Sequence, residues 1–270
     1  MSSTVAQILS LPGAFLTHWY ASWNSSSTTK PTTAGAAIYS PLFLNAVYDR
    51  LVLGFYCTHV WRCPSYVIQA LCSTLVSQAA TKTPRILDIG VGTGYFLANI
   101  PSSFILPGTT FTLVDLNPAC LETASARCRT SHGDEVKVNT VRGDFLAPPD
   151  DAASVHSLLK DDGRFDVVLT NMLLHCVPGP PARKAAALAG LAAKVERVDG
   201  VLAGVTILGD GVQHNLLGRF IMFWHNALGM FDNQADGAKV FVEALQNTFE
   251  SVVWRVEGTV LIFEARRPKA

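Results

Sequence analysis

From residue 85 onward, short apolar runs alternate with longer stretches whose apolar residues recur every three or four positions. Short runs bounded by turn residues predict buried strands, and the longer stretches predict helices. The expected strands cover residues 85–89, 110–115, 136–141, 165–170, 201–208, 251–257 and 259–265; expected helices begin near 94 and cover 118–129, 181–195, 213–230 and 236–249. This alternation is typical of a parallel sheet with crossover helices. The last two strands, joined at Gly258, predict a closing antiparallel hairpin.

The segment before the first strand has a purely helical pattern. Residues 41–80 predict two helices that begin after Pro41 and Pro64, because proline suits the first turn of a helix. We expect this segment to form a helical cap. Residues 1–40 contain an apolar stretch followed by a Ser/Thr-rich stretch. They predict an N-terminal extension, either partly ordered or a lid over a substrate.

The chain is organised around residues 85–94, R-I-L-D-I-G-V-G-T-G, a strand followed by a glycine turn and a helix start. Its glycines are Gly90, Gly92 and Gly94. Glycine tolerates positive φ and has no Cβ, so backbone here can come close to a ligand. A pyrophosphate-binding turn requires G-x-G-x-x-G or A, and Tyr95 breaks that pattern. Asp88 would repel a pyrophosphate but suits a cationic head group, such as the ammonium and sulfonium of S-adenosylmethionine (SAM).

A second acid follows at the spacing expected for a ribose contact. Asp115 ends the next strand 21 residues after Gly94, and an acid about 20 residues past such a turn binds ribose hydroxyls. We therefore expect Asp115, with Leu116 beside it, at the cofactor. After the third strand, Asp144 is placed to accept from an adenine amino group and Phe145 to lie on the ring. The alternative for Asp144 is an ordinary turn aspartate.

These motifs, L-D-I-G-V-G-T-G followed by L-V-D-L-N-P, resemble those of the class I SAM-dependent methyltransferases. From about residue 48 onward the chain is similar to a group of short small-molecule methyltransferases of bacteria and filamentous fungi. The likeness is carried by Y-D-R-L-V-L-G-F, V-W-R-C-P, G-V-G-T-G-Y-F-L and L-L-H-C-V-P-G. It implies an α/β fold with a doubly wound, seven-stranded sheet whose last strand is antiparallel. It also implies a SAM-binding Rossmann-like core over residues 81–270 and a role in secondary metabolism.

Three further residues are expected at the cofactor. Asn171 follows the fourth strand, and ligands of open α/β sheets bind past the carboxyl ends of strands. Tyr48 and Arg62 belong to the N-terminal helical segment. Arg62 could reach the SAM carboxylate; the alternative is a solvated or structural arginine. Tyr48 is alternatively a core aromatic residue.

His175 is the predicted general base. It follows the fourth strand on the ligand side of the sheet, and an imidazole with a pKa near 6.5 can take a hydroxyl or thiol proton at neutral pH. The resemblance places L-L-H-C in the same loop of relatives. The alternative is a structural role, and the rival bases are His59, Tyr48, His214 and His225.

Aromatic residues on both sides of the core are expected to hold the acceptor. They are His59, Trp61, His214, Phe220 and Trp224. Trp61 is alternatively a core residue. The helix over 213–230 has more apolar residues than one packing face needs, so it is predicted to cap a fairly apolar substrate. A hydroxyl oxygen is favoured as the acceptor atom, while thiol, amine and carbon remain open. The alternative function is a protein that binds SAM without moving a methyl group.

Composition restricts the partners. The 270 residues carry 21 basic and 21 acidic side chains, and this neutrality argues against nucleic acid or an anionic membrane. The tetrad of amino-methylating enzymes that act on nucleic acid bases is also missing at residues 171–174. Six cysteines without C-x-x-C pairs predict reduced cytoplasmic thiols and no metal. The sequence does not decide between a monomer and a homodimer.

Overall fold

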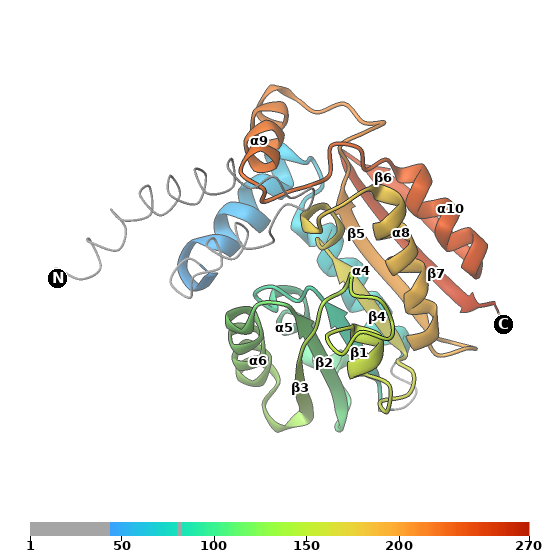
Figure 1. Ribbon diagram of the computed structural model, residues 1–270. Helices are drawn as coiled ribbons and strands as arrows, with labels where there is room; N and C mark the ends of the chain where they lie inside the picture. The colour runs from blue at the N-terminus through green and yellow to red at the C-terminus, as the bar shows by residue number, and fades with distance from the viewer. Residues whose placement is uncertain (1–43, 80–82, 270) are drawn as a thin grey trace.

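The computed structural model describes residues 44–79 and 83–269, so the extension predicted over residues 1–40 lies outside them. Its centre is one seven-stranded sheet in the order β3-β2-β1-β4-β5-β7-β6 (Figure 1). The strands are β1 (Arg85–Ile89), β2 (Thr109–Asp115), β3 (Val136–Arg142), β4 (Val167–Asn171), β5 (Val201–Ile207), β6 (Phe249–Glu257) and β7 (Val260–Pro268). The strands β1 to β5 pair in parallel, and β7 pairs antiparallel with both β5 and β6. The predicted α/β sheet with an antiparallel last strand is confirmed.

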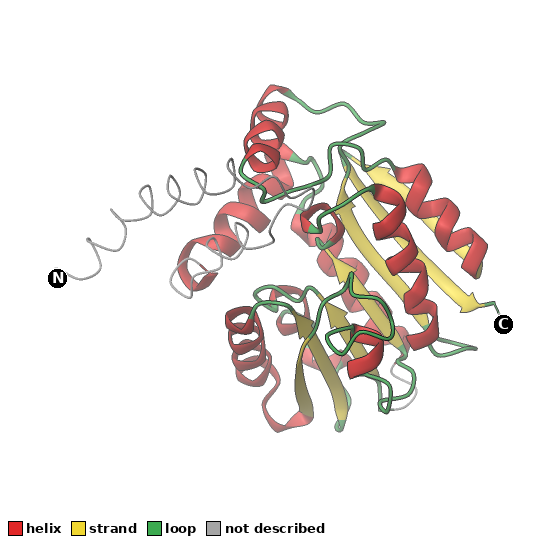
Figure 2. Cartoon of the chain, in the orientation of Figure 1, coloured by secondary structure: helices red, strands yellow, loops and turns green. Residues whose placement is uncertain are grey.

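Helices cover both faces of this sheet (Figure 2). They are η1 (Leu44–Val60), α4 (Ser65–Ala79), α5 (Tyr95–Ala98), η2 (Ser102–Phe104), α6 (Pro118–His132), η3 (Gly133–Glu135), α7 (Val155–Leu158), η4 (Leu174–Cys176), α8 (Pro181–Gly190), η5 (Leu191–Lys194), α9 (Leu216–Ala227) and α10 (Ala238–Thr248). Among the described residues, no helix is long and apolar enough to cross a membrane.

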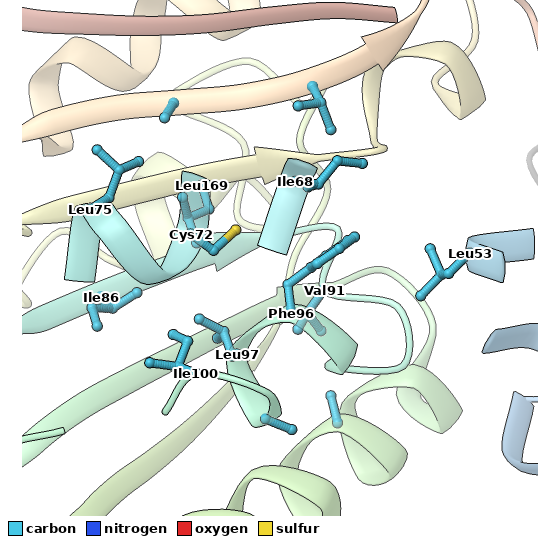
Figure 3. Packing of buried hydrophobic residues seen from close by; sticks show 14 of the residues in the cluster. Leu53, Ile68, Cys72, Leu75, Ile86, Val91, Phe96, Leu97, Ile100 and Leu169 are labelled. Atoms are coloured by element: carbon cyan, nitrogen blue, oxygen red, sulfur yellow. The ribbon is translucent and has the colours of Figure 1, made fainter. Parts of the chain in front are cut away.

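One face of the sheet packs against α4, α5 and α6. Side chains of successive strand residues point to opposite faces, so Ile86 and Leu169 face this side. Figure 3 shows both in the cluster that also contains Ile68, Cys72 and Leu75 of α4. Leu53 of η1 belongs to the same cluster. The helix pair ahead of the first strand is therefore part of this core layer.

The opposite face packs against α7, α8 and α10. The alternation along β1 places Leu87 and Ile89 on this side. In Figure 1, α8 and α10 lie in front of the sheet. A buried ion pair joins this layer to the carboxyl edge, because Lys184 Nζ of α8 lies 2.7 Å from Asp236 Oδ2. It ties the segment between α9 and α10 to the helix layer.

Most predicted boundaries moved by one to five residues, and two of these shifts have a clear physical reason. The strand expected from residue 165 begins at Val167, because the Phe165 N–H donates to the Lys194 carbonyl outside the sheet. The helix expected over 213–230 begins at Leu216, because the Asn215 side chain caps it by accepting from the Gly218 N–H (2.7 Å). The second N-terminal helix covers Ser65–Ala79, as the proline at its start predicts.

Candidate active site

The glycine turn after β1 is built from three glycines with positive φ, each with a different neighbour. A Cβ on Gly90 would meet Leu173 at 2.6 Å, and a Cβ on Gly94 would meet the Ala124 backbone at 2.8 Å. Those two glycines therefore allow close packing against η4 and α6. A Cβ on Gly92 would meet no heavy atom of the described residues within 4 Å. Gly92 is the position at which the turn opens for a ligand.

Asp115 at the end of β2 holds this turn in place. Its Oδ2 accepts from the Gly92 N–H (3.2 Å), and its Oδ1 accepts from the Asn117 N–H (2.9 Å). Burial raises the pKa of the Asp115 carboxyl, while bonds from backbone N–H groups oppose that rise. Asp115 thus lies beside Gly92, as the spacing predicts, and it also has a structural role that the spacing does not reveal.

Asp88 lies on β1, only 4% exposed, and its Oδ1 has no hydrogen-bond partner among the described residues. Burial, and then the nearby Asp115 charge, raise the pKa of this carboxyl to about 7. A buried carboxylate oxygen without a donor is unfavourable until a cation or a proton meets it. The residue is therefore suited to a positively charged group bound next to the glycine turn.

The end of β4 presents a second buried acceptor on the same face of the sheet. Asn171 donates from Nδ2 to Cys72 Sγ (3.2 Å), and its Oδ1 has no hydrogen-bond partner within the described ranges. Burial raises the pKa of the Cys72 thiol to about 12, so the thiol stays protonated. Met172 follows with φ of 56°, a left-handed conformation that is strained for methionine. The chain turns sharply here, at the carboxyl edge.

Asp144 and Phe145 lie past the end of β3. Asp144 Oδ1 accepts from the Leu146 N–H (2.8 Å), the local bond of a turn aspartate, while the carboxylate stays half-buried. Phe145 is also half-buried and packs on the α8 side of the sheet. Leu116, after β2, is 43% exposed. All three lie at the carboxyl edge, where the prediction placed an adenosine group.

The structure adds a group of residues that the motifs missed. Asp49 of η1 accepts from Arg127 of α6 (2.7 Å) and from the Thr93 hydroxyl (3.0 Å), and Arg127 also donates to Thr93 Oγ1 (3.2 Å). The three residues fasten η1 to the glycine turn. The available signals were the aspartate in the shared Y-D-R stretch and the threonine inside the turn, but nothing in the sequence connects either to Arg127.

The structure does not bring Arg62 to the glycine turn. Its side chain is exposed and donates to the Gln213 carbonyl oxygen. The backbone N–H of Thr259, in the hairpin turn between β6 and β7, donates to the carbonyl of Trp61, the residue before Arg62. This bond fixes the segment that carries Arg62 next to β7, three strands away from β1. Tyr48 belongs to η1, but its side chain lies outside the described part of the chain.

A cluster of aromatic rings lies at the carboxyl edge around Phe231. His175 of η4 and His225 of α9 contact it, with ring centroids at 4.6 and 4.7 Å. Trp61 lies at 6.0 Å, and Tyr56 of η1 lies 6.0 Å from His225. The blue η1 and the orange α9 lie side by side in Figure 1. Three stretches far apart in sequence, at residues 56–61, 175 and 225–231, thus meet in one aromatic cluster.

His175, the predicted base, is 3% exposed and its Nδ1 faces the Thr206 hydroxyl (3.4 Å). Burial and then the nearby Lys184 charge lower the pKa of its imidazole to about 3. The ring is therefore neutral at physiological pH, and its low affinity for a proton makes it a weak base. Sequence spacing located the loop correctly and gave no indication of this burial.

The predicted acceptor contacts lie in different environments. His59 and Phe220 are exposed, and Trp224 is 46% exposed. Trp61 is 1% exposed, which leaves almost no surface for a ligand. His214 donates from Nε2 to the Leu208 carbonyl (2.9 Å). Of these residues, Trp61 and His214 join the rings of the Phe231 cluster, with centroids 6.0 Å apart.

Comparisons with known proteins place the chain in a family. A methyltransferase domain model matches residues 87–202. The "Physcion biosynthesis cluster O-methyltransferase" of Aspergillus chevalieri is 38% identical over 241 residues, 88% of this chain and 97% of that relative. The chain belongs to the class I SAM-dependent methyltransferases. "Methyltransferase verB" of Penicillium polonicum is 37% identical over 82% of this chain and 93% of its own length.

Solved structures agree with the fold of this methyltransferase. An O-methyltransferase family protein from Burkholderia thailandensis superposes with a TM-score of 0.62 at 16% identity, covering 96% of this chain and 72% of that one. SAM is the cofactor of the family, and two features of the site fit its methionine part. The orphaned Asp88 oxygen suits an ammonium group, and the open face of Gly92 leaves room for the ligand.

Proposed function

We propose that this methyltransferase moves the methyl group of SAM to a hydroxyl oxygen of a small, fairly apolar acceptor in secondary metabolism. The observation that carries the proposal is the contrast between two surfaces: the buried Asp88, whose Oδ1 has no partner among the described residues, beside the open Gly92, and the aromatic rings around Phe231. The first suits a cationic cofactor and the second suits a planar, apolar acceptor. The names of the fungal relatives support a hydroxyl acceptor and biosynthetic context.

Each part of the cofactor has a proposed contact. The ammonium lies between Asp88 Oδ1 and Asn171 Oδ1, two of the buried oxygen atoms that have no hydrogen-bond partner among the described residues. The methionine carboxylate lies along the Gly92 backbone, and the ribose hydroxyls lie at the Asp115 carboxylate. Asp144, with Phe145 and Leu116, receives the adenine. Bound SAM supplies an electrophilic methyl group, so the protein has to align the acceptor and receive its proton.

The N-terminal segment has a proposed role on the acceptor side. η1 contacts the glycine turn through Asp49 and the aromatic cluster through Tyr56. Asp49 and Tyr56 are seven residues apart on this one helix, so a single element reaches both places. In this proposal η1, within the predicted cap segment, covers the space between cofactor and acceptor. Phe220 and Trp224 remain predicted acceptor contacts that would act only when the exposed side of α9 is covered.

The test is product formation. Purified protein is incubated with SAM and panels of phenols, aliphatic alcohols, thiols and amines, and S-adenosylhomocysteine and methylated product are measured by mass spectrometry. We expect methylated phenols or alcohols in equal amount to S-adenosylhomocysteine. Binding of SAM in calorimetry without product from any hydroxyl compound, or from an extract of the producing organism, would contradict the proposal.

A further inference from the structure

His225 differs from the other histidines of the site in how its imidazole is held. Its Nδ1 lies 2.8 Å from the Ile221 carbonyl oxygen, one turn earlier on α9. A carbonyl oxygen can only accept a hydrogen bond, so Nδ1 carries the proton of the neutral ring. The lone pair therefore lies on Nε2. This bond to the helix backbone orients the ring in the way that general bases require.

The bond at Nδ1 leaves the Nε2 atom of His225 available for another partner. His225 is half-buried, and Nε2 has no hydrogen bond within the described residues and is not among their fully buried unpaired atoms. An atom that is neither bonded nor fully buried is open to solvent or to a ligand. The His225 ring contacts two other rings of the cluster, with its centroid 4.7 Å from that of Phe231 and 6.0 Å from that of Tyr56.

The alternatives are less suited to accept a proton. His175 is 3% exposed, and its pKa is lowered to about 3. His214 donates from Nε2 to the Leu208 carbonyl, and its Nδ1 is buried without a partner. His59 is exposed and contacts Phe55, away from the Phe231 cluster. Burial lowers the pKa of His225 as well, though the bond to Ile221 opposes this effect.

Tyr56 supplies a donor next to this base. The residue is half-buried on η1, and no hydrogen bond of its hydroxyl is found within the described ranges. Burial raises the pKa of the phenol, so the hydroxyl stays protonated and can donate. A substrate oxygen placed between Tyr56 and His225 would be held by a donor and a base from two different helices.

We infer that His225 Nε2 accepts the proton of the acceptor hydroxyl, while the Tyr56 hydroxyl donates to the same oxygen and positions it. The inference rests on the proposed O-methylation. The acceptor O–H bond breaks and its proton goes to Nε2; the oxygen forms a bond to the methyl carbon, and the electrons of the broken S–C bond stay on sulfur. The imidazolium then releases its proton to water.

The test compares two matched variants. In His225→Asn the amide nitrogen replaces Nδ1 and retains the bond to Ile221, so the variant removes the base but preserves the local fold. We expect kcat to fall by about 10²–10⁴-fold, with the affinity for S-adenosylhomocysteine within twofold of wild type. His175→Asn removes the rival base and should lower kcat by a clearly smaller factor than His225→Asn does. Acceptors that ionise by themselves, such as nitrophenols, should recover most of the rate in His225→Asn.

A second readout needs neither SAM nor acceptor. Nitrogen-15 imidazole spectra of the ligand-free protein should show His225 with its proton on Nδ1, and diethyl pyrocarbonate should modify His225 faster than His175. Modification of His175 first, or a proton on Nε2 of His225, would contradict the inference. Tyr56→Phe should raise the acceptor KM several-fold with a smaller change in kcat.

The outcomes separate the two proposals. If the wild type forms no product from hydroxyl compounds, the proposed function fails. If the wild type is active and His225→Asn retains its kcat, the function stands and His225 is not the base. A large loss of kcat confined to His175→Asn would return the role to His175.

Discussion

The proposed cofactor side and the proposed acceptor side of this methyltransferase are assembled differently. On the cofactor side, β1, the glycine turn and β2 lie within residues 85–115, and backbone N–H groups and acids make the contacts. On the acceptor side, η1, η4, α9 and the loop at Phe231 come together over more than 170 residues of sequence, and aromatic rings make the contacts. The first side has its geometry fixed locally, whereas the second depends on the packing of distant helices.

This difference separates the binding of the cofactor from the selection of the acceptor. A site made of backbone and two acids can remain unchanged while it binds the same cofactor throughout a family. A site made of side chains from separate helices can change its shape with single substitutions. The acceptor side should therefore tolerate substitutions that alter which compound is methylated, whereas the cofactor side should tolerate few.

The largest expected effect comes from the glycine turn. Gly92→Val should weaken SAM binding by more than about 100-fold, because the branched side chain enters the open space of the turn and its φ of 55° strains an L-residue. The melting temperature should fall by only a few degrees. Gly94→Val is the contrasting variant: its Cβ meets the Ala124 backbone at 2.8 Å, so the fold itself should be destabilised by about 2–4 kcal/mol.

Calorimetric SAM titration and thermal unfolding check both variants. If Gly92→Val binds SAM normally, the ligand does not approach this turn. If Gly94→Val is as stable as wild type, the close approach of α6 to the turn is wrong.

The next effect concerns Asp115. Asp115→Ala should weaken SAM binding by about 1.5–3 kcal/mol, the scale for hydrogen bonds to a charged group. Because the carboxylate also accepts from the Gly92 and Asn117 N–H groups, we expect a loss of stability of about 1–2 kcal/mol as well. Asp144→Ala, whose carboxylate bonds only its local turn in the described chain, is the control and should lose less stability. Unchanged SAM affinity in Asp115→Ala would remove it from the ribose site.

The same contrast explains what the sequence could predict. Alternating strands and helices, the antiparallel last strand and the glycine turn follow from local periodicity and spacing, so they were predictable. Asp115 was found by its distance along the chain from Gly94. The ring cluster around Phe231 depends on where η1 and α9 pack, and no local pattern encodes that. His175 was therefore placed in the correct loop, but its burial could not be foreseen.

Burial hides electrostatics from sequence analysis for the same reason. Asp88 was chosen for the sign of its charge, yet its lack of a partner and its pKa of about 7 follow from the three-dimensional surroundings. The Asp49–Thr93–Arg127 group joins residues 78 positions apart at its widest. The spacing of these three residues along the sequence does not predict their contact. They meet only because η1 packs against α6 and the glycine turn.

A smaller effect on stability and on cofactor affinity is expected from a change in pH. The folded-state pKa of Asp88, about 7, lies above its ordinary value of 3.8, so the ligand-free protein binds this proton more tightly than the unfolded chain. Its contribution to stability is present below about pH 4 and is lost as pH rises through 7, with a slope of at most about 1.4 kcal/mol per unit. Binding of the cofactor ammonium needs the ionised carboxylate, so affinity should rise over the same range.

Titrations with S-adenosylhomocysteine between pH 5.5 and 8 measure this, together with denaturant unfolding of the ligand-free protein. Affinity should increase up to about tenfold per pH unit below 7, while the free energy of unfolding decreases. Asp88→Asn should flatten both curves, which separates Asp88 from Asp115, whose pKa is also raised by burial. A stability curve that rises over this range in the wild type would show that Asp88 is already paired.

The smallest effect distinguishes two arginines, one on each side of the comparison. Arg127→Met removes the contacts to Asp49 and Thr93 but keeps the side-chain stem on α6. The ion pair is about one-quarter exposed at both ends, so its strength is reduced by solvent. We expect SAM affinity to fall by about three- to tenfold, since hydrogen bonds to charged groups contribute about 1.5–3 kcal/mol only when they are well buried.

Arg62→Met is the matched control for Arg127→Met. The exposed Arg62 donates to the Gln213 carbonyl at the hairpin edge, so SAM affinity should change by less than about twofold, within the usual range for exposed side chains. Calorimetry with S-adenosylhomocysteine measures both variants without turnover. Equal losses would mean that the segment carrying Arg62 reaches the cofactor after all. A loss confined to Arg127→Met would show that η1 contributes to cofactor binding through the glycine turn. The reason is that one guanidinium nitrogen of Arg127 donates both to Asp49 of η1 and to Thr93 of the turn.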